Sequence, residues 1–234
     1  MNTRTWSIAR FPQEGANAFA VLLWLGYFLL IVGITVVVSM TGTVGESIWG
    51  NATTLPRWFA WGTGLWLTGS YLRLHVAHGS TRREFLQRST VYLVAFAILL
   101  GCLITLGFLL EWALYAATGL RHPLATEPAA LVTQILPTYI LIFGVWSAVG
   151  TLVAAGYRRL AGTGLLITIP VGVATVVLTE DALDTRYLGK WIGFDLSLIG
   201  SLPVGVAIGV AGFLVALAGT WALCRDVAVP GTGV

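Results

Sequence analysis

The sequence predicts an all-α membrane protein that crosses the bilayer as six transmembrane helices. Three observations favour this fold class: a high apolar fraction, few charged residues, and six long apolar runs separated by short polar segments. Of the 234 residues, 57% are hydrophobic and 10% are charged, whereas soluble domains carry about 25% charged residues. This composition excludes a soluble cytosolic enzyme, a disordered chain and a disulfide-stabilised secreted domain.

The apolar runs have the length of membrane-spanning helices. About 20 helical residues cross a hydrocarbon core of about 30 Å, whereas strands of a membrane barrel would show short stretches of alternating polarity. The second run is the weakest, because it is short and contains three glycines. We expect one transmembrane domain, 1–234, whose spans are Ala18–Met40, Pro56–Leu72, Val91–Thr118, Thr133–Gly156, Ala161–Thr179 and Ser197–Leu223.

The basic residues predict how the chain is oriented in the membrane. An excess of Lys and Arg marks the cytoplasmic side of a membrane protein. With six spans, nine of the 13 basic residues fall on the side of the N-terminus, so both termini are expected in the cytoplasm and the protein in a bacterial inner (plasma) membrane. These nine residues are Arg4, Arg10, Arg73, Arg82, Arg83, Arg88, Arg158, Arg159 and Arg225. The outer side holds Arg57, Arg121, Arg186, Lys190 and most of the acids.

Two segments outside the apolar runs carry an amphipathic pattern. The N-terminal stretch up to Asn17 mixes arginines with large apolar residues, which favours a helix lying flat on the membrane surface. The outer segment from Glu180 to Leu196 places aromatic residues between acids. This mixture predicts a short interfacial or re-entrant helix before the last span.

Several kinds of chemistry are missing from the sequence. The sole lysine, Lys190, precedes Trp191, so the chain lacks the Gly-Lys-Ser/Thr of a nucleotide-hydrolysing loop. It also lacks the His-Glu-x-x-His zinc motif and the Gly-x-Ser-x-Gly nucleophile motif. His75 and His78 could reach one metal ion, but no third ligand is evident, so a helix end beside the membrane is the favoured explanation. We expect no catalytic activity, no metal, no cofactor and no nucleic-acid partner.

Glu111 is the one acid inside an apolar run. An ionisable group in a membrane span costs at least a few kcal/mol, which makes it a candidate for transport or coupling. The alternative is that Glu111 reaches the outer interface beside Trp112 and Tyr115. The sequence leaves both interpretations open.

The segment His75–Leu86 is the most distinctive in the chain. A helix leaving the second span should break at Gly79 and restart with Ser80 or Thr81 as its N-cap. Thr81 is followed three residues later by Glu84, as in a capping box. The spacing predicts a short cytoplasmic helix that carries its arginines outward and Phe85 inward. Such a helix suits docking to a soluble partner, although a loop that only sets topology explains the charges equally.

In this segment the chain resembles the permease subunits of ABC type-2 exporters, which join their second and third spans by a cytoplasmic coupling helix. The pattern Gly-x-Ser/Thr-Arg-Arg-x-Phe of that helix is matched by residues of this loop, and the predicted topology is similar too. The resemblance implies that an ABC ATP-binding subunit docks on the coupling residues. They are Gly79, Ser80, Thr81, Arg82, Arg83, Glu84 and Phe85.

The resemblance further implies a permease without an ATPase of its own, exporting a substrate with energy from a separate subunit. That partner would bind ATP and magnesium, and a second permease copy or a related chain would complete the transporter in membrane lipid. One alternative is a six-span substrate-capture subunit of an uptake transporter, which would need convergent polar groups near the outer side. Another is a lipid-modifying membrane enzyme, for which only the outer acids Glu180, Asp181 and Asp184 qualify.

Overall fold

The computed structural model describes residues 21–22, 24–38, 40, 47–119, 127–193 and 201–225. Every regular element in these ranges is a helix and none is a strand, which confirms the all-α class. The contacts form two compact units, and the single transmembrane domain stays a prediction. Unit 1 lies within residues 1–52 and 107–128, and unit 2 within residues 53–106 and 129–234. The predicted surface-lying N-terminal stretch is outside the described residues.

Unit 1 packs around Trp49. It contains the apolar helix Trp24–Val38, helix α2 (Ile48–Ala52) and the last turns of α5, whose first turns belong to unit 2. Trp49 is 1% exposed, and its ring meets the Phe28 ring edge-on with centroids 5.2 Å apart. Gly107 leaves the space for the indole, because a Cβ there would lie 1.7 Å from it.

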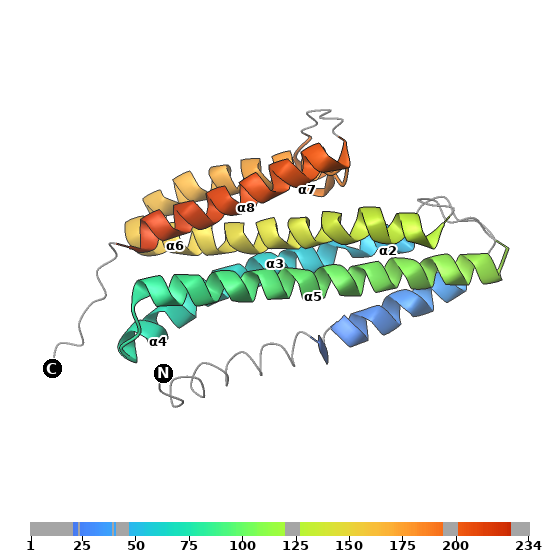
Figure 1. The fold of residues 1–234 in the computed structure, drawn as a ribbon, viewed down its shortest axis with the longest axis horizontal. Coiled ribbons are helices and arrows are strands. Elements are labelled where there is room, and N and C mark those ends of the chain that lie inside the picture. Colours follow the sequence, from blue (N-terminus) through green and yellow to red (C-terminus); the bar gives the residue numbers. More distant parts are fainter. Residues whose placement is uncertain are drawn as a thin grey trace. The chain divides into compact units, whose positions relative to one another are not determined.

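Unit 2 holds most of the helices. At one end of it, α4, the start of α5, the bend of α6 and the end of α8 come together (Figure 1). Leu72, Phe85, Ala155 and Cys224 form a hydrophobic cluster at this end. Its elements are α3 (Thr54–Trp66), the π-helical turn η1 (Leu67–Tyr71), α4 (Leu72–Ala77), the first part of α5 (Arg82–Ala117), α6 (Pro128–Ala182), α7 (Tyr187–Ile192) and α8 (Leu202–Cys224).

Helix α6 consists of two antiparallel limbs. The chain reverses at Ala161, whose φ of 49° and ψ of −130° are not helical. The limbs approach closely near the bend, because a Cβ on Gly164 would lie 2.0 Å from the carbonyl oxygen of Gly156. Farther along, Gly172 packs against Val149. The two limbs correspond to the fourth and fifth apolar runs of the sequence.

Glycines also bring α3 against the first limb of α6. A Cβ on Gly64 would lie 1.9 Å from the Ser147 carbonyl oxygen, and one on Gly150 would lie 2.2 Å from the Trp61 carbonyl oxygen. Small residues at such contacts let helix backbones approach each other in membranes, where lipid supplies no hydrophobic drive for helix association. The glycines that weaken the second run as a sequence signal therefore form its tightest packing contacts.

Three of the described helices are long and apolar enough to cross a membrane. They are α5, α6 and α8, and the helix Trp24–Val38 is a shorter apolar one. Backbone groups in lipid must be satisfied within the protein, and helices meet this condition. The protein is therefore a multi-pass, all-α membrane protein. That the chain crosses the membrane six times, and that both termini lie in the cytoplasm, stay predictions.

Candidate functional site

The break after α4 has the conformation that the sequence predicts. Gly79 has a φ of +81°, in the left-handed region where a side chain is strained. The Gly79 N–H donates to the Val76 carbonyl and the Ser80 N–H to the His75 carbonyl, both over 3.0 Å. These two bonds form a Schellman motif, which ends a helix by satisfying its last carbonyls. The predicted break at Gly79 is confirmed.

The cap of α5 is also confirmed, but the predicted short helix is not a separate element. The Thr81 Oγ1 accepts a hydrogen bond from the Glu84 N–H over 3.2 Å. The Glu84 carboxylate does not complete a capping box with the Thr81 N–H and instead pairs with Arg88 over 2.6 Å. Helix α5 then continues unbroken through Arg82–Ala117. The coupling segment is therefore the first turns of a membrane-spanning helix, because a drop in hydropathy does not end backbone hydrogen bonding.

The side chains of this segment point in different directions. Phe85 is 1% exposed and its ring lies 5.3 Å from the His75 ring, so it anchors the turn inward as predicted. Arg82 donates from Nη1 to the Arg225 carbonyl oxygen at the end of α8, over 2.9 Å. Arg83 is exposed. Of the two arginines, Arg82 ties helices together and Arg83 stays available.

Two further arginines at this end bind main-chain carbonyls of other helices. Arg158 donates to the Gly69 carbonyl, which belongs to the π-helical turn η1. Arg159 donates to the Ala222 carbonyl in the last turn of α8 over 2.7 Å. The Ala222 carbonyl lies in the last turn of α8, where carbonyls lack helical partners and cations are stabilised. The end of unit 2 that holds the α4–α5 turn is thus basic and held together by arginine.

Glu111 lies in unit 1 and is buried, at 2% exposure. Its carboxylate accepts hydrogen bonds from the Ser47 hydroxyl over 2.6 Å, the Ile48 N–H over 2.7 Å and the Tyr115 hydroxyl over 3.1 Å. The Trp49 N–H adds a longer contact of 3.4 Å. The carboxylate therefore caps the N-terminus of α2 in the interior of the unit. Its transport role stays a prediction.

The other end of unit 2 contains a buried ion pair, which no sequence motif predicts. Arg57 of α3 and Glu180 of α6 are 3% and 1% exposed, and Nε lies 3.4 Å from Oε1. Glu180 also accepts hydrogen bonds from the Trp146 indole N–H over 3.0 Å and from the Leu188 N–H over 2.7 Å. We call these four residues the charge site. They come from α3, α7 and both limbs of α6.

Aromatic rings surround the Arg57 guanidinium. Its carbon lies 4.7 Å from the centroid of the Tyr187 ring and 5.9 Å from that of Tyr139, within the range of cation–π attraction. Trp58 donates from its indole to the Tyr187 hydroxyl over 3.1 Å, and its ring lies 5.1 Å from Trp146. The charge site therefore combines a buried ion pair with several aromatic rings.

Helix α7 covers the charge site. Tyr187 stacks on Arg57, and the next residue donates its N–H to Glu180. Asp184, Arg186 and Gly193, which flank this helix, all have positive φ, at 55°, 41° and 68°. Left-handed backbone is strained for residues other than glycine and marks positions where surrounding contacts dictate the conformation.

The remaining outer acids pair with Arg186. Its Nε lies 3.5 Å from Asp181, which is 4% exposed, and 3.3 Å from Asp184, which is 86% exposed. The arrangement thus places two arginines and three acids near the start of α7. Within the described residues, no group of three or more His, Cys, Asp or Glu side chains could hold a metal ion.

The sequence contains a signal for the charge site. Arg57 and Glu180 were assigned to the same side of the membrane, at the edges of two apolar runs. An ionisable residue at the edge of a span needs a partner when it is buried, so one cation and one acid on the same side form a candidate pair. Their distance along the chain hides which residues meet.

Comparison with known proteins gives one distant relative. The ascorbate-specific PTS system EIIC component of Mycoplasma pneumoniae is 29% identical over 175 residues, which cover 74% of this chain. The same region is 24% of that protein, so the match spans about a quarter of its length. No family model matches the chain, and no solved structure matches it.

Proposed function

We propose that the chain is a membrane-embedded component of an uptake transporter and that the charge site takes part in handling the substrate. The observation that carries this proposal is the buried pair of Arg57 and Glu180 in its aromatic surroundings. A capture subunit needs convergent polar groups near the outer side of the membrane. The charge site supplies them at the end of unit 2 that the basic residues predict to be outside.

The energetics favour a functional reason for this pair. Removing two charges from water costs several kcal/mol per ion, and an apolar pair of equal volume is often as stable. Charged residues in spans therefore mark substrate or ion pathways by default. Aromatic rings beside hydrogen-bonding groups suit a small, hydroxylated organic molecule, which would gain stacking and directed hydrogen bonds. The printed substrate of the distant relative, ascorbate, is the first probe to use.

Access to the charge site requires movement of α7. The Tyr187 ring covers the Arg57 guanidinium, and the Leu188 N–H binds the Glu180 carboxylate. A substrate that binds these two charged groups must therefore displace the Tyr187 ring and the Leu188 N–H. Arg186, directly before α7, and Gly193, directly after it, have positive φ and are the positions where we expect the backbone to change conformation. The chain itself would supply binding and passage, while other components of the transporter would supply energy and any catalytic step.

Uptake of labelled ascorbate by cells tests this proposal. Cells lacking the chain would be complemented with wild type, Glu180→Gln, Trp146→Phe or the control Asp184→Asn. We expect Glu180→Gln and Trp146→Phe to lower uptake at least about tenfold, and Asp184→Asn to stay within about twofold, because that side chain is 86% exposed. Wild-type uptake by a correctly inserted Glu180→Gln protein would refute a role for the charge site. Uptake that does not depend on the chain would refute the transporter assignment for this substrate.

A second candidate function is that of an ABC-type exporter permease, which acts with a separate ATP-binding subunit. The observation that favours it is the α4–α5 turn, which presents the exposed Arg83 on a turn fixed by Gly79, Thr81 and Phe85. A fixed, basic element of this kind suits docking of a soluble subunit. Purification of the tagged chain from its native membrane decides between the candidates. An ABC ATPase in the eluate supports the exporter, and its absence contradicts it.

A further inference from the structure

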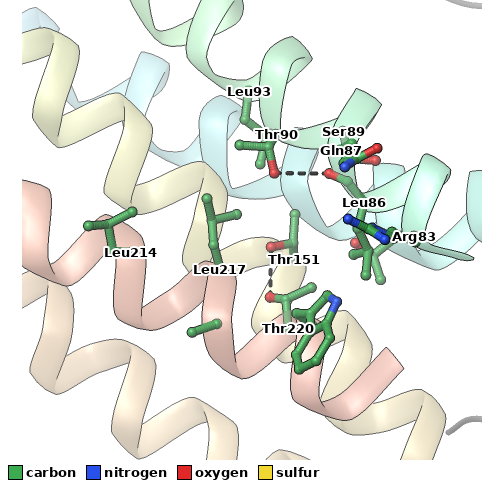
Figure 2. A pocket seen from close by; sticks show the side chains of 13 residues that line it. Arg83, Leu86, Gln87, Ser89, Thr90, Leu93, Thr151, Leu214, Leu217 and Thr220 are labelled. Atoms are coloured by element: carbon green, nitrogen blue, oxygen red, sulfur yellow. Dashed lines mark hydrogen bonds between the residues drawn. The ribbon is translucent and has the colours of Figure 1, made fainter. Parts of the chain in front are cut away.

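A cavity of about 370 Å³ opens in unit 2 between α5, α6 and α8, at the basic end (Figure 2). One part of its wall is apolar: Leu93 of α5 and Leu214 and Leu217 of α8 line it. Trp221, near the end of α8, lines the cavity as well and is 48% exposed. Tryptophan at a helix end is typical of the level where membrane headgroups lie.

The opposite part of the wall is polar and positively charged. Arg83 lines the cavity and makes no hydrogen bond or ion pair within the described chain, unlike Arg82 beside it. Thr68 and Ser89 also line it, are 1% and 8% exposed, and their hydroxyls find no partner among the described residues. Neither oxygen is among the fully buried atoms that lack a partner, so both hydroxyls are open to the cavity. Two hydroxyl donors and one free guanidinium facing the same cavity therefore suit a ligand that accepts hydrogen bonds and carries negative charge.

Along the helices, the charged Arg83 is followed by apolar residues, in the same order as the headgroup and the acyl chains of a lipid. Arg83 lies in the first turn of α5, and Leu93 is ten residues farther along the same helix, which is about 15 Å at 1.5 Å per residue. That length is about half of a hydrocarbon core of about 30 Å, or one leaflet. Figure 2 shows Arg83 at one end of the cavity and Leu214 at the other. Thr68 belongs to η1, and π-helical turns occur frequently at functional sites.

The geometry points to a binding site for one anionic phospholipid of the membrane leaflet at the basic end. Its phosphate group pairs with Arg83 and accepts hydrogen bonds from Ser89 and Thr68, and an acyl chain lies along the accessible Leu214 and Leu217. A free phosphate ion would satisfy only the polar part and leave the apolar wall uncovered. An uncharged or zwitterionic lipid would cover that wall but leave Arg83 without a net negative partner.

Lipid binding to the purified full-length chain tests this site. In an uncharged detergent, native mass spectrometry would compare phosphatidylglycerol with phosphatidylcholine of the same acyl chains, and inorganic phosphate would be a third arm. We expect phosphatidylglycerol to bind about fivefold more tightly than phosphatidylcholine, the gain typical of one arginine at an anionic headgroup. Arg83→Gln should remove this preference. Arg73→Gln is the matched control, because Arg73 is exposed and does not line the cavity, so the preference should remain.

A second variant tests the apolar wall independently of charge. Leu217→Trp fills the cavity with a larger apolar side chain and should weaken binding of both lipids while leaving the melting temperature of the lipid-free protein nearly unchanged. Equal affinity for the two lipids, equal loss in Arg73→Gln and Arg83→Gln, or unchanged binding in Leu217→Trp would each overturn the proposal. Displacement of phosphatidylglycerol by an equal concentration of inorganic phosphate would identify an anion site and overturn the lipid assignment.

Discussion

Breaking the buried pair of Arg57 and Glu180 should destabilise the protein far more than breaking an exposed pair nearby. Arg57→Met leaves the Glu180 carboxylate buried with only the N–H groups of Trp146 and Leu188 as partners. Glu180→Gln leaves the Arg57 guanidinium buried against aromatic rings without a counter-charge. Removing one partner of a buried pair costs about 3–5 kcal/mol, because an uncompensated charge stays in the protein.

The double variant shows whether the pair acts as a unit. With both charges removed, no uncompensated charge remains, so Arg57→Met plus Glu180→Gln should cost at least about 2 kcal/mol less than the sum of the single changes. The free energy of unfolding would be measured by tryptophan fluorescence in mixed micelles. Asp184→Asn, which breaks an exposed contact to Arg186, is the control and should cost less than about 1 kcal/mol. Additive single effects of less than about 1 kcal/mol would show that the two charges do not interact.

Three further changes test other parts of the structure. Gly64→Ala should lower the free energy of unfolding by about 1–3 kcal/mol, because its Cβ would overlap a carbonyl of α6, whereas Gly62→Ala, which meets nothing within 4 Å, should be neutral or stabilising. Glu111→Ala should destabilise by about 2 kcal/mol or more and increase hydrogen exchange in α2, and unchanged exchange would contradict its capping role. Thr81→Ala should cost about 0.5–2 kcal/mol in the same unfolding assay, and Thr81→Ser, which keeps the cap, should cost less.

Local signals in the sequence predicted local structure well. The third to sixth apolar runs coincide with α5, α6 and α8, which are long and apolar enough to cross a membrane, and the bend of α6 at Ala161 falls at the start of the fifth predicted run. Gly79 and Thr81 predicted the helix stop and the helix start, because a Schellman turn and an N-cap depend on a few neighbouring residues. The length of α5 was less predictable, since Arg82 to Arg88 lower the hydropathy without interrupting the helix.

The charge site required tertiary structure. Arg57 and Glu180 meet only because α3 packs against the first limb of α6 and the second limb folds back at Ala161. Neither periodicity nor motif spacing contains that information. Glu111 was recognised as unusual, but its burial depends on α2 supplying N–H groups at the right place. The sequence therefore predicts which residues are unusual, and the fold decides which of them act together.

The direction of net flux tests the central claim, that the chain serves uptake through the charge site, most directly. Labelled ascorbate would be followed in cells with and without the chain, once with the label outside and once with the cells preloaded. We expect the chain to increase accumulation from outside, and we expect Glu180→Gln, present in the membrane at normal amounts, not to do so. Faster loss from preloaded cells without accumulation, or equal accumulation with and without the chain, would contradict it.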